Sequence, residues 1–244
     1  MKIGILGYGE VGQAIEKVYK DFPEFEVRIK DLNRDDGIEN VEVLNICVPF
    51  SKSFVDIVSK EINKINPKLT IIHSTVAPET TKKIKQLIPK ELFVVHSPIR
   101  GIHPQLYEGV KTFVKYVGGD SKEELEAAGS HLRKLGLNIR LFENSTTTEM
   151  GKLLDTTYYA TVVAWHGEMK KMCDKYNLDF DKTVTDFNET YNKGYAELNK
   201  KNVIRPVLYP PPENRIGGHC LIPNAKLLKE IFDSEALDLI LKYS

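Results

Sequence analysis

The feature that most constrains the fold is the glycine-rich start of the chain, which begins KIGILGYGEVG after the initial Met. The apolar run at residues 2–6 predicts a short buried strand, and the helical spacing of apolar residues at 11–18 predicts a helix. Between them, Gly7, Gly9 and Gly12 fall in a G-x-G-x-x-G spacing. The chain therefore starts with a strand, a glycine turn and a helix, which is the context that gives this spacing a functional meaning.

That context predicts a dinucleotide-binding turn. Gly7 permits the tight turn, Gly9 lets a pyrophosphate approach the backbone, and Gly12 lets the helix pack closely on the strand. The helix N-terminus adds free N–H groups and a partial positive charge. We therefore expect the cofactor to contact the whole turn, Gly7, Tyr8, Gly9, Glu10, Val11 and Gly12.

An acidic residue follows at the distance that such folds use for the adenosine ribose. Residues 25–30 alternate like a strand and lead directly into Asp31. An acid at this point hydrogen-bonds the ribose hydroxyls. It favours NAD over NADP, because the 2′-phosphate of NADP would meet a negative charge. Lys30 and Arg34 weaken this preference without reversing it, so NAD is the expected cofactor.

Strand-like and helix-like patterns then alternate up to about residue 143. Strands are predicted at 41–48, 69–73, 92–96, 112–117 and 137–141, and helices at 51–65, 78–87 and 122–135. The connection at 32–40 is too short for a crossover helix. The alternation predicts an α/β fold, a doubly wound, mostly parallel Rossmann sheet, in an NAD-binding domain that covers residues 1–143.

The remaining residues, 144–244, predict an all-helical domain. Ser145 is a plausible N-cap, and large side chains then recur in steps of three and four, which predicts one long helix at 145–177. Further helices are expected at 181–199 and 224–242. The large side chains of the long helix are interpreted as core rather than as cofactor contacts. A helix of this length needs a partner to cover it, so we expect a homodimer formed through this domain.

Composition excludes several classes of function. The 34 basic and 34 acidic residues cancel, which argues against nucleic acid and anionic membrane surfaces as partners. No apolar run reaches the length of a transmembrane helix, and the N-terminus lacks a signal-peptide pattern. The three cysteines, Cys47, Cys173 and Cys220, are widely spaced and form no metal-binding pattern. We therefore expect a cytoplasmic protein with a small-molecule substrate and no metal site.

Two features are candidates for chemistry. Cys220 follows two glycines and precedes the last predicted helix, where a helix N-terminus would stabilise its thiolate. Lys152 shares a helix face with Glu149 and Thr156, and a lysine beside an apolar stripe can act as acid, base or oxyanion partner. On these residues alone, a structural cysteine and a solvated helix face are the simpler interpretations.

Taken together, the motifs resemble the UDP-glucose/GDP-mannose 6-dehydrogenase family in order and spacing over essentially the whole chain. The matching segments are the glycine turn, Cys47-Val48-Pro49, Ser74-Thr75-Val76, Ser97-Pro98, Thr148 to Leu154, and Gly217 to Cys220. The resemblance implies a stepwise oxidation of a sugar primary alcohol to a carboxylate with two NAD.

The resemblance also implies roles for individual residues. Cys220 would attack the aldehyde and form a thiohemiacetal, then a thioester. Lys152 would stabilise the oxyanion or shuttle the alcohol proton. Thr75 would lie near the nicotinamide and a catalytic water. The matching segments also place Val48 and Pro49 among the cofactor-binding residues.

The sequence departs from the family at three of these positions. Ile99 stands where the family has Glu, Thr156 where it has Asn, and Asn224 where it has Asp. Two of the lost groups are carboxylates, so we expect hydrolysis of the thioester to be impaired. Thr156 and Asn224 stay in the expected catalytic set with Cys220, Lys152 and Thr75.

Two further points bear on that expectation. His96 and His103 lie near the missing Glu and are candidate substitutes, although a structural role is the simpler interpretation of each. The family also continues into a second Rossmann-like domain that holds the nucleotide, whereas this chain ends at Ser244. We therefore expect only half of the family's usual substrate site.

Three functions follow as hypotheses. The first is an NAD-dependent oxidoreductase that acts on a primary alcohol or aldehyde. Its substrate is a sugar or nucleotide-sugar, or a molecule smaller than a nucleotide-sugar. Alternatively, a partner chain completes the substrate site. The second is a one-step hydroxyacid or alcohol dehydrogenase, in which Lys152 works and Cys220 does not. The third is an NAD-binding protein without turnover, which the lost carboxylates favour and the retained Lys152 and Cys220 oppose.

Overall fold

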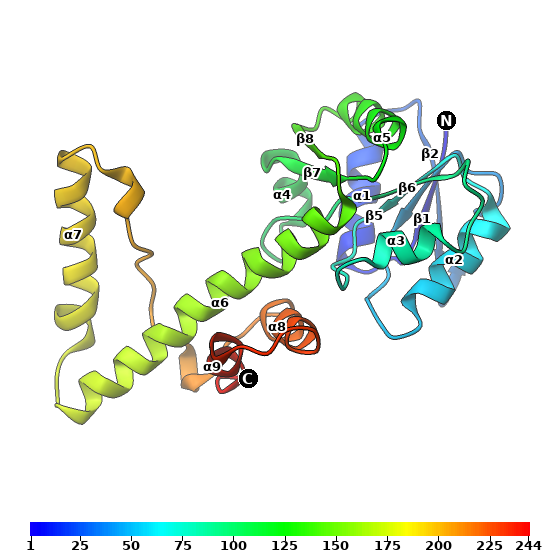
Figure 1. Ribbon diagram of the computed structural model, residues 1–244. Coiled ribbons are helices and arrows are strands. Elements are labelled where there is room, and N and C mark those ends of the chain that lie inside the picture. Colours follow the sequence, from blue (N-terminus) through cyan, green and yellow to red (C-terminus); the bar gives the residue numbers. More distant parts are fainter. The chain divides into compact units, whose positions relative to one another are not determined.

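The computed structural model describes residues 1–244, which divide into two compact units, Met1–Lys152 and Leu153–Ser244. One continuous helix, α6 (Ser145–Lys175), begins in the first unit and runs on into the second (Figure 1). None of the helices combines the length with the apolar character that a membrane-spanning segment needs.

The first unit contains one eight-stranded sheet in the order β3-β2-β1-β4-β5-β6-β7-β8. Its strands are β1 (Lys2–Leu6), β2 (Glu26–Asp31), β3 (Arg34–Asp35), β4 (Val43–Ile46), β5 (Leu69–Ile72), β6 (Phe93–His96), β7 (Lys115–Gly118) and β8 (Ile139–Phe142). β2, β1, β4, β5 and β6 run parallel, whereas β3 and the β7–β8 pair are antiparallel to their neighbours. The predicted α/β class with a mostly parallel sheet is confirmed. The strand order reverses between β1 and β4, which is where doubly wound sheets bind ligands.

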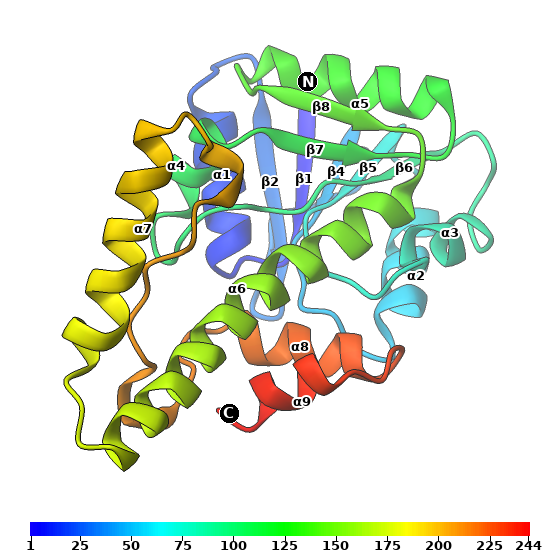
Figure 2. The ribbon, with the colours of Figure 1, turned by 60° about the vertical axis from the view of Figure 1, so that its left-hand side comes forward.

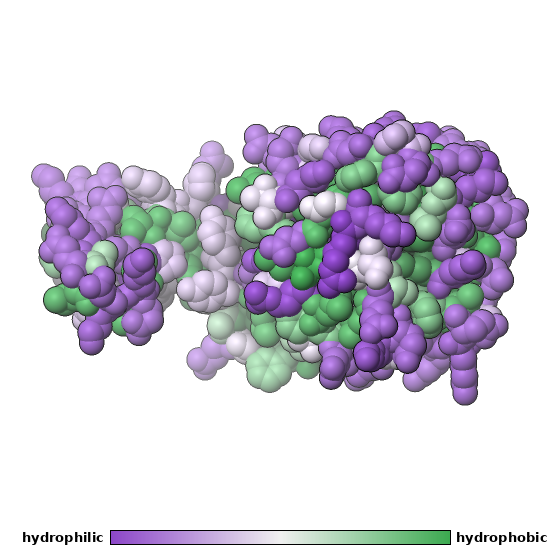
Figure 3. Space-filling view, turned by 90° about the horizontal axis from the view of Figure 1, so that it is seen from above, coloured by the Kyte–Doolittle hydropathy of each residue, from purple (hydrophilic) through white to green (hydrophobic).

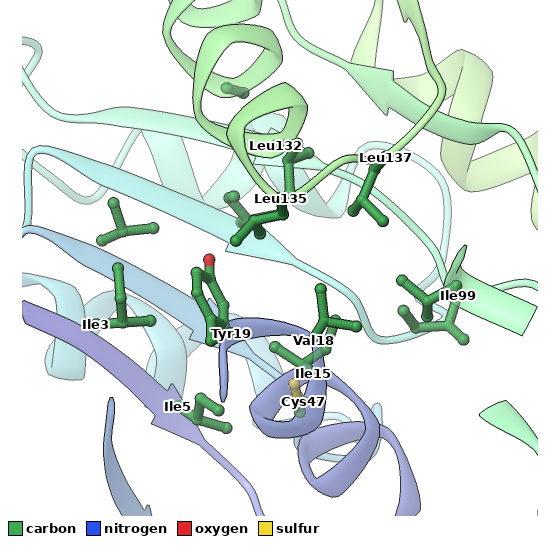
Figure 4. Close-up of a cluster of buried hydrophobic side chains, with 14 of the residues drawn as sticks. Ile3, Ile5, Ile15, Val18, Tyr19, Cys47, Ile99, Leu132, Leu135 and Leu137 are labelled. Carbon is green, nitrogen blue, oxygen red and sulfur yellow. The ribbon is translucent and has the colours of Figure 1, made fainter. Parts of the chain in front are cut away.

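Helices cover both faces of the sheet. They are α1 (Glu10–Lys20), α2 (Phe54–Ile65), α3 (Thr80–Lys85), α4 (Leu106–Thr112) and α5 (Lys122–Lys134). The apolar cluster in Figure 4 joins one face to α1, α4 and α5, and a second cluster joins the other face to α2 and α3. The sequence did not predict α4 or β3, because elements of seven and two residues are too short to show a periodicity.

The second unit is helical, as predicted. After α6 it contains a π-helical turn (Asp181–Thr185), α7 (Asp186–Glu197), two 3₁₀ turns (Lys201–Val203 and Pro212–Asn214), α8 (Leu221–Lys229) and α9 (Glu235–Leu241). The single helix predicted at 224–242 is wrong, because Ser234 adopts an extended conformation (φ −156°, ψ 131°) and separates α8 from α9. Lys229 bridges the break by pairing with Asp238 at 2.7 Å, so the two helices pack together.

The end of α9 docks against α6 (Figure 2). Tyr243 is 1% exposed, and its hydroxyl donates to Glu168 at 2.6 Å. Its ring covers Gly167 so closely that a Cβ there would lie 2.5 Å away. The Tyr243 carbonyl accepts a hydrogen bond from Ile216 N at 2.7 Å, which holds the segment that leads to Cys220.

The stripe of large side chains on α6 is not core within the single chain. Its exposed members are Leu154, Tyr158, Trp165, Met172 and Tyr176, with exposed fractions between 48% and 69%. The buried positions of α6 in this unit are mostly small, such as Ala160 and Ala164. Phe187 on α7 and Leu198 directly after it are also exposed, and apolar patches are visible on the surface in Figure 3. The period of the sequence identifies an apolar face, but it does not say what covers that face.

Candidate active site

The three glycines of the turn differ in what surrounds them. Gly7 has φ +93°, and a Cβ on it would lie 2.7 Å from Val48 N. A Cβ on Gly12 would lie only 2.1 Å from Gly7 O, whereas one on Gly9 would meet nothing within 4 Å. The backbone is thus tight at the turn and at the helix contact, and open at Gly9, where a pyrophosphate would approach.

Asp31 ends β2 next to this turn. Its carboxylate accepts hydrogen bonds from Tyr8 N and from Leu32 N, the latter at 2.5 Å. Asp31 therefore fixes the glycine turn, in addition to its predicted role as the ribose ligand. Sequence analysis missed this second role, because it joins residues 23 positions apart.

A pocket of about 480 Å³ opens beside the turn, and its lining includes Gly7, Asp31, Leu32, Val48, Pro49 and Phe54. The two basic residues near Asp31 are both neutralised. Lys30, which also lines the pocket, pairs with Glu61 at 2.8 Å, and Arg34 pairs with Asp36 at 2.7 Å. Each of these two cations therefore has a carboxylate partner beside the turn.

The loops after β4 and β5 lie together at the carboxyl edge of the sheet. Ser74 is buried, and its hydroxyl donates to Val48 O at 2.6 Å. This bond places the half-buried Thr75 beside the segment Val48-Pro49, which in turn contacts Gly7. The structure therefore brings the expected cofactor-binding residues of three separate loops to one edge.

The first turns of α6 are anchored to the Rossmann unit. The N-cap is Asn144 rather than the predicted Ser145, because Asn144 Oδ1 accepts from Thr146 N at 3.0 Å. Ser145 instead donates to Asp120 through both its N–H and its hydroxyl at 3.0 Å. Lys152 follows two turns later and is half-buried.

Glu149 has a structural role that differs from that of Lys152. Its carboxylate is fully buried and accepts hydrogen bonds from Glu79 N at 2.6 Å and from both Thr81 N and Thr81 Oγ1. It therefore caps the N-terminus of α3. Burial raises the pKa of Glu149. Sequence spacing placed these side chains on one helix face, but only the tertiary contacts separate their roles.

The two histidines near Ile99 also differ. His96 is fully buried, donates through Nε2 to Ser74 O at 3.1 Å, and accepts at Nδ1 from Thr148 at 2.8 Å. Burial lowers the pKa of His96 to about 3, so it is neutral and structural. His103 instead pairs with Glu10 at the glycine turn. Ile99 itself packs in the first apolar cluster and is 6% exposed. Its side chain contributes to the apolar core and cannot act as a base.

Cys220 is the N-cap residue of α8, which begins at Leu221, three residues before the helix that the sequence predicted from 224. It is half-buried, and Gly218 before it has φ +90°. In the first turn of α8, Asn224 Nδ2 donates to Thr156 Oγ1 at 3.0 Å, and both side chains are buried. Two of the three departures from the family pattern therefore contact each other, 68 residues apart. Their bond fixes the first turn of α8, which follows Cys220, to the part of α6 that lies in the second unit.

A second pocket, of about 390 Å³, lies beside the Cys220 loop within the helical unit. Its lining includes Tyr159 and Val163 of α6, the three prolines at 210–212, and Gly217. Arg215 is its only charged lining residue. Sequence analysis described this stretch only as irregular and did not identify the pocket.

Known proteins resemble the chain in sequence and in fold. No family model matches the sequence. UDP-N-acetyl-D-mannosamine dehydrogenase of Methanococcus vannielii is 29% identical over 209 residues, which cover 80% of this chain and 46% of that protein. The structure of UDP-D-ManNAc dehydrogenase from Pyrococcus horikoshii aligns with TM-score 0.77 and 19% identity over 100% of this chain and 68% of that one. Mycobacterium tuberculosis 3-hydroxyisobutyrate dehydrogenase aligns with TM-score 0.72 and 15% identity over 98% and 91%.

The structural matches show the fold alone, because their sequence identities are below 25%. The sequence matches add relatives with a stated activity. The chain spans about half the length of these curated relatives. These relatives share one name, which agrees with the family that the motifs indicated. The chain is therefore similar in sequence to proteins named UDP-N-acetyl-D-mannosamine dehydrogenase, at 22–29% identity.

Proposed function

We propose that the chain is an NAD-dependent oxidoreductase that acts on the primary alcohol or aldehyde of a sugar substrate. The observation that carries this proposal is the glycine turn, which is open at Gly9 and bordered by Asp31 at the end of β2. The named relatives are dehydrogenases of a UDP-sugar, which supports a substrate of the nucleotide-sugar class. Arg215 in the second pocket offers a positive charge for a phosphate of such a substrate.

Different residues of the chain have separate roles in the two proposed oxidation steps. The glycine turn and Asp31 would hold NAD, which would supply the hydride acceptor for each oxidation step. Lys152 takes the proton of the alcohol and then faces the oxygen of the aldehyde. The Cys220 thiolate adds to the aldehyde carbon, and loss of the second hydride leaves a thioester on sulfur. Thr75 lies at the nicotinamide side, and Thr156 with Asn224 holds the turn that carries Cys220.

The last step, hydrolysis of the thioester, lacks its carboxylates. Ile99 is apolar and buried, and Asn224 donates its amide N–H to Thr156 and cannot act as a base. Loss of a general base typically lowers a rate by about 10²–10⁴-fold. We therefore expect hydride transfer to proceed and the acyl-enzyme to accumulate.

The proposal is tested by incubating the protein with NAD and a panel of UDP-sugars and sugar aldehydes while NADH is followed by absorbance. We expect a burst of about one NADH per subunit followed by slow turnover. Tight binding of NAD with no NADH from any substrate would instead support the non-catalytic hypothesis.

One observation favours a second candidate, a one-step hydroxyacid or alcohol dehydrogenase. Ile99 fills a carboxylate position with apolar packing, so the chain lacks a group that only the two-step reaction requires. In this case Lys152 alone would act on the alcohol, and Cys220 would be dispensable. Steady-state turnover that survives removal of the thiol would identify this case.

Asp31→Ala is expected to weaken NAD binding by about 10- to 100-fold. The variant loses a charge-assisted hydrogen bond to the ribose, worth of order 1–3 kcal/mol, and it also releases Tyr8 N in the turn. Calorimetric titration with NAD and NADP measures the effect. Asp21→Ala, which removes a carboxylate at the other end of α1, is the matched control and should bind NAD normally. Tighter binding of NADP than of NAD by the unaltered protein would refute the role of Asp31.

We also propose that the protein is a homodimer that buries the exposed stripe of α6. Leu154, Tyr158, Trp165 and Met172 repeat in steps of four and seven, so they form one continuous exposed face. Light scattering at micromolar concentration should give twice the chain mass of 27.7 kDa. The double variant Tyr158→Glu/Trp165→Glu should be monomeric, whereas Lys122→Glu on α5 should leave the dimer intact. A monomeric unaltered protein would contradict the proposal.

A further inference from the structure

A buried lysine lies under the carboxyl edge of the sheet, outside the residues assigned to chemistry. Lys115 is the first residue of β7 and is 3% exposed. Its ammonium group donates to Ser97 O, to Pro98 O at 3.0 Å and to His73 Nδ1 at 3.2 Å. No carboxylate is among these partners, which is unusual because a buried charge normally needs an opposite charge.

The hydrogen-bond network determines the tautomer of His73. Asn45 Nδ2 donates to Gly4 O at 3.2 Å, so the amide oxygen of Asn45 faces His73. That oxygen accepts from His73 Nε2 at 2.9 Å, so Nδ1, which lies 3.2 Å from Lys115 Nζ and 3.0 Å from Ser97 O, carries the lone pair that accepts from Lys115. Burial and the charge of Lys115 hold the pKa of His73 well below its usual range. The three N–H groups of an ammonium thus meet three acceptors.

The acceptors of Lys115, and the Asn45 side chain that accepts from His73, lie at or near the ends of neighbouring strands. Asn45 lies in β4, His73 directly follows β5, and Ser97-Pro98 follows β6. In a Rossmann sheet the adenosine half of the cofactor lies over β1 and β2, so the nicotinamide half lies over β4 to β6. The loops that carry Val48-Pro49 and Thr75 start from these same ends.

We propose that Lys115 is a positioning residue that holds the ends of β4, β5 and β6 in register and thereby shapes the nicotinamide half of the cofactor site. The inference rests on the proposed binding of NAD. Lys115 touches no reacting atom, and it acts through the backbone of Ser97-Pro98 and through His73.

The proposal implies a dependence on pH. Burial, opposed by Cys47 just after β4 and assisted by Lys152 on α6, lowers the pKa of Lys115 to about 7. His73, directly after β5, and His96 at the end of β6 also face the ammonium, and both are neutral in this range. Below pH 7 the ammonium donates to all three acceptors. Above it, the neutral amine has only two N–H groups, and its lone pair is repelled by one carbonyl.

The test compares NADH with ADP-ribose, which lacks the nicotinamide. NADH is chosen because its dihydronicotinamide ring is uncharged. We expect the ratio of their dissociation constants to change between pH 6 and 8.5 with a midpoint near 7. Lys115→Met should weaken NADH about tenfold relative to ADP-ribose and remove the pH dependence. Lys115→Arg, which stays charged, should keep the low-pH ratio throughout. Lys111→Met, at a surface lysine paired with Asp21, should behave like the unaltered protein.

The outcomes separate the two proposals. If the unaltered protein binds neither ligand, the proposed function fails and this inference falls with it. If both ligands bind, but their ratio is constant with pH and is unchanged in Lys115→Met, only the role of Lys115 is refuted. If Lys115→Met does not fold, the pH series of the unaltered protein and of Lys115→Arg decides, because a flat series in the unaltered protein refutes the inference.

Discussion

Replacing Cys220 by Ser should abolish the covalent intermediate and reduce aldehyde oxidation by on the order of 10⁴-fold or more, as expected when a covalent nucleophile is removed. The thiol stands at the N-cap of α8, and a serine hydroxyl at the same place is a far weaker nucleophile than a thiol. The change removes the nucleophile and leaves cofactor binding unaltered, because the glycine turn lies in the other unit. We therefore expect normal NAD affinity together with the loss of the NADH burst.

Intact-protein mass spectrometry after incubation with NAD and a reactive aldehyde measures the acyl adduct directly. The adduct should appear on the unaltered protein, because Ile99 and Asn224 cannot activate the water that would release it. Cys173→Ala is the matched control, since Cys173 is 3% exposed in the same unit and should not affect the adduct. Full steady-state activity of Cys220→Ser would show that the reaction is a one-step oxidation that does not use the thiol.

Gly12→Ala should destabilise the Rossmann unit by about 3 kcal/mol or more. The added methyl would lie 2.1 Å from Gly7 O and 3.1 Å from Gly7 C. Both atoms belong to the backbone of the turn, which is itself held against Val48, so neither can move aside cheaply. The helix α1 must shift away from β1, and the cofactor turn is distorted with it. Such a loss is a large part of the 5–15 kcal/mol that stabilises a typical domain.

Gly9→Ala separates folding from binding in the same turn. Its methyl would meet nothing within 4 Å, so the free energy of unfolding should stay within about 1 kcal/mol of the unaltered protein. The methyl nevertheless enters the space through which a pyrophosphate reaches the backbone, so NAD binding should be strongly weakened. Urea denaturation and calorimetric titration on both variants measure the two effects. Equal stability of Gly12→Ala and Gly9→Ala would contradict the assignment of the glycines.

The Rossmann strands and the long helix could be predicted because their signals depend only on residues close together in sequence. Apolar runs of four to six residues, three glycines at fixed spacing and a repeat of three and four each depend only on neighbours in sequence. The strands of the sheet were predicted to within a few residues, apart from the two-residue β3. The position of Asp31 followed from the length of one βαβ turn. The catalytic hypothesis for Cys220 and Lys152 depended on the order of several motifs and on no single one.

Only the tertiary structure decided which of these residues act on each other. The bond between Thr156 and Asn224 and the contact of Lys115 with His73 join residues 68 and 42 positions apart, which no local period connects. The exposure of the α6 stripe and the break between α8 and α9 also depend on what packs nearby. Burial and hydrogen bonding are properties of the folded environment, so the sequence determined the elements and the chemical groups, and the fold determined their protonation and their partners.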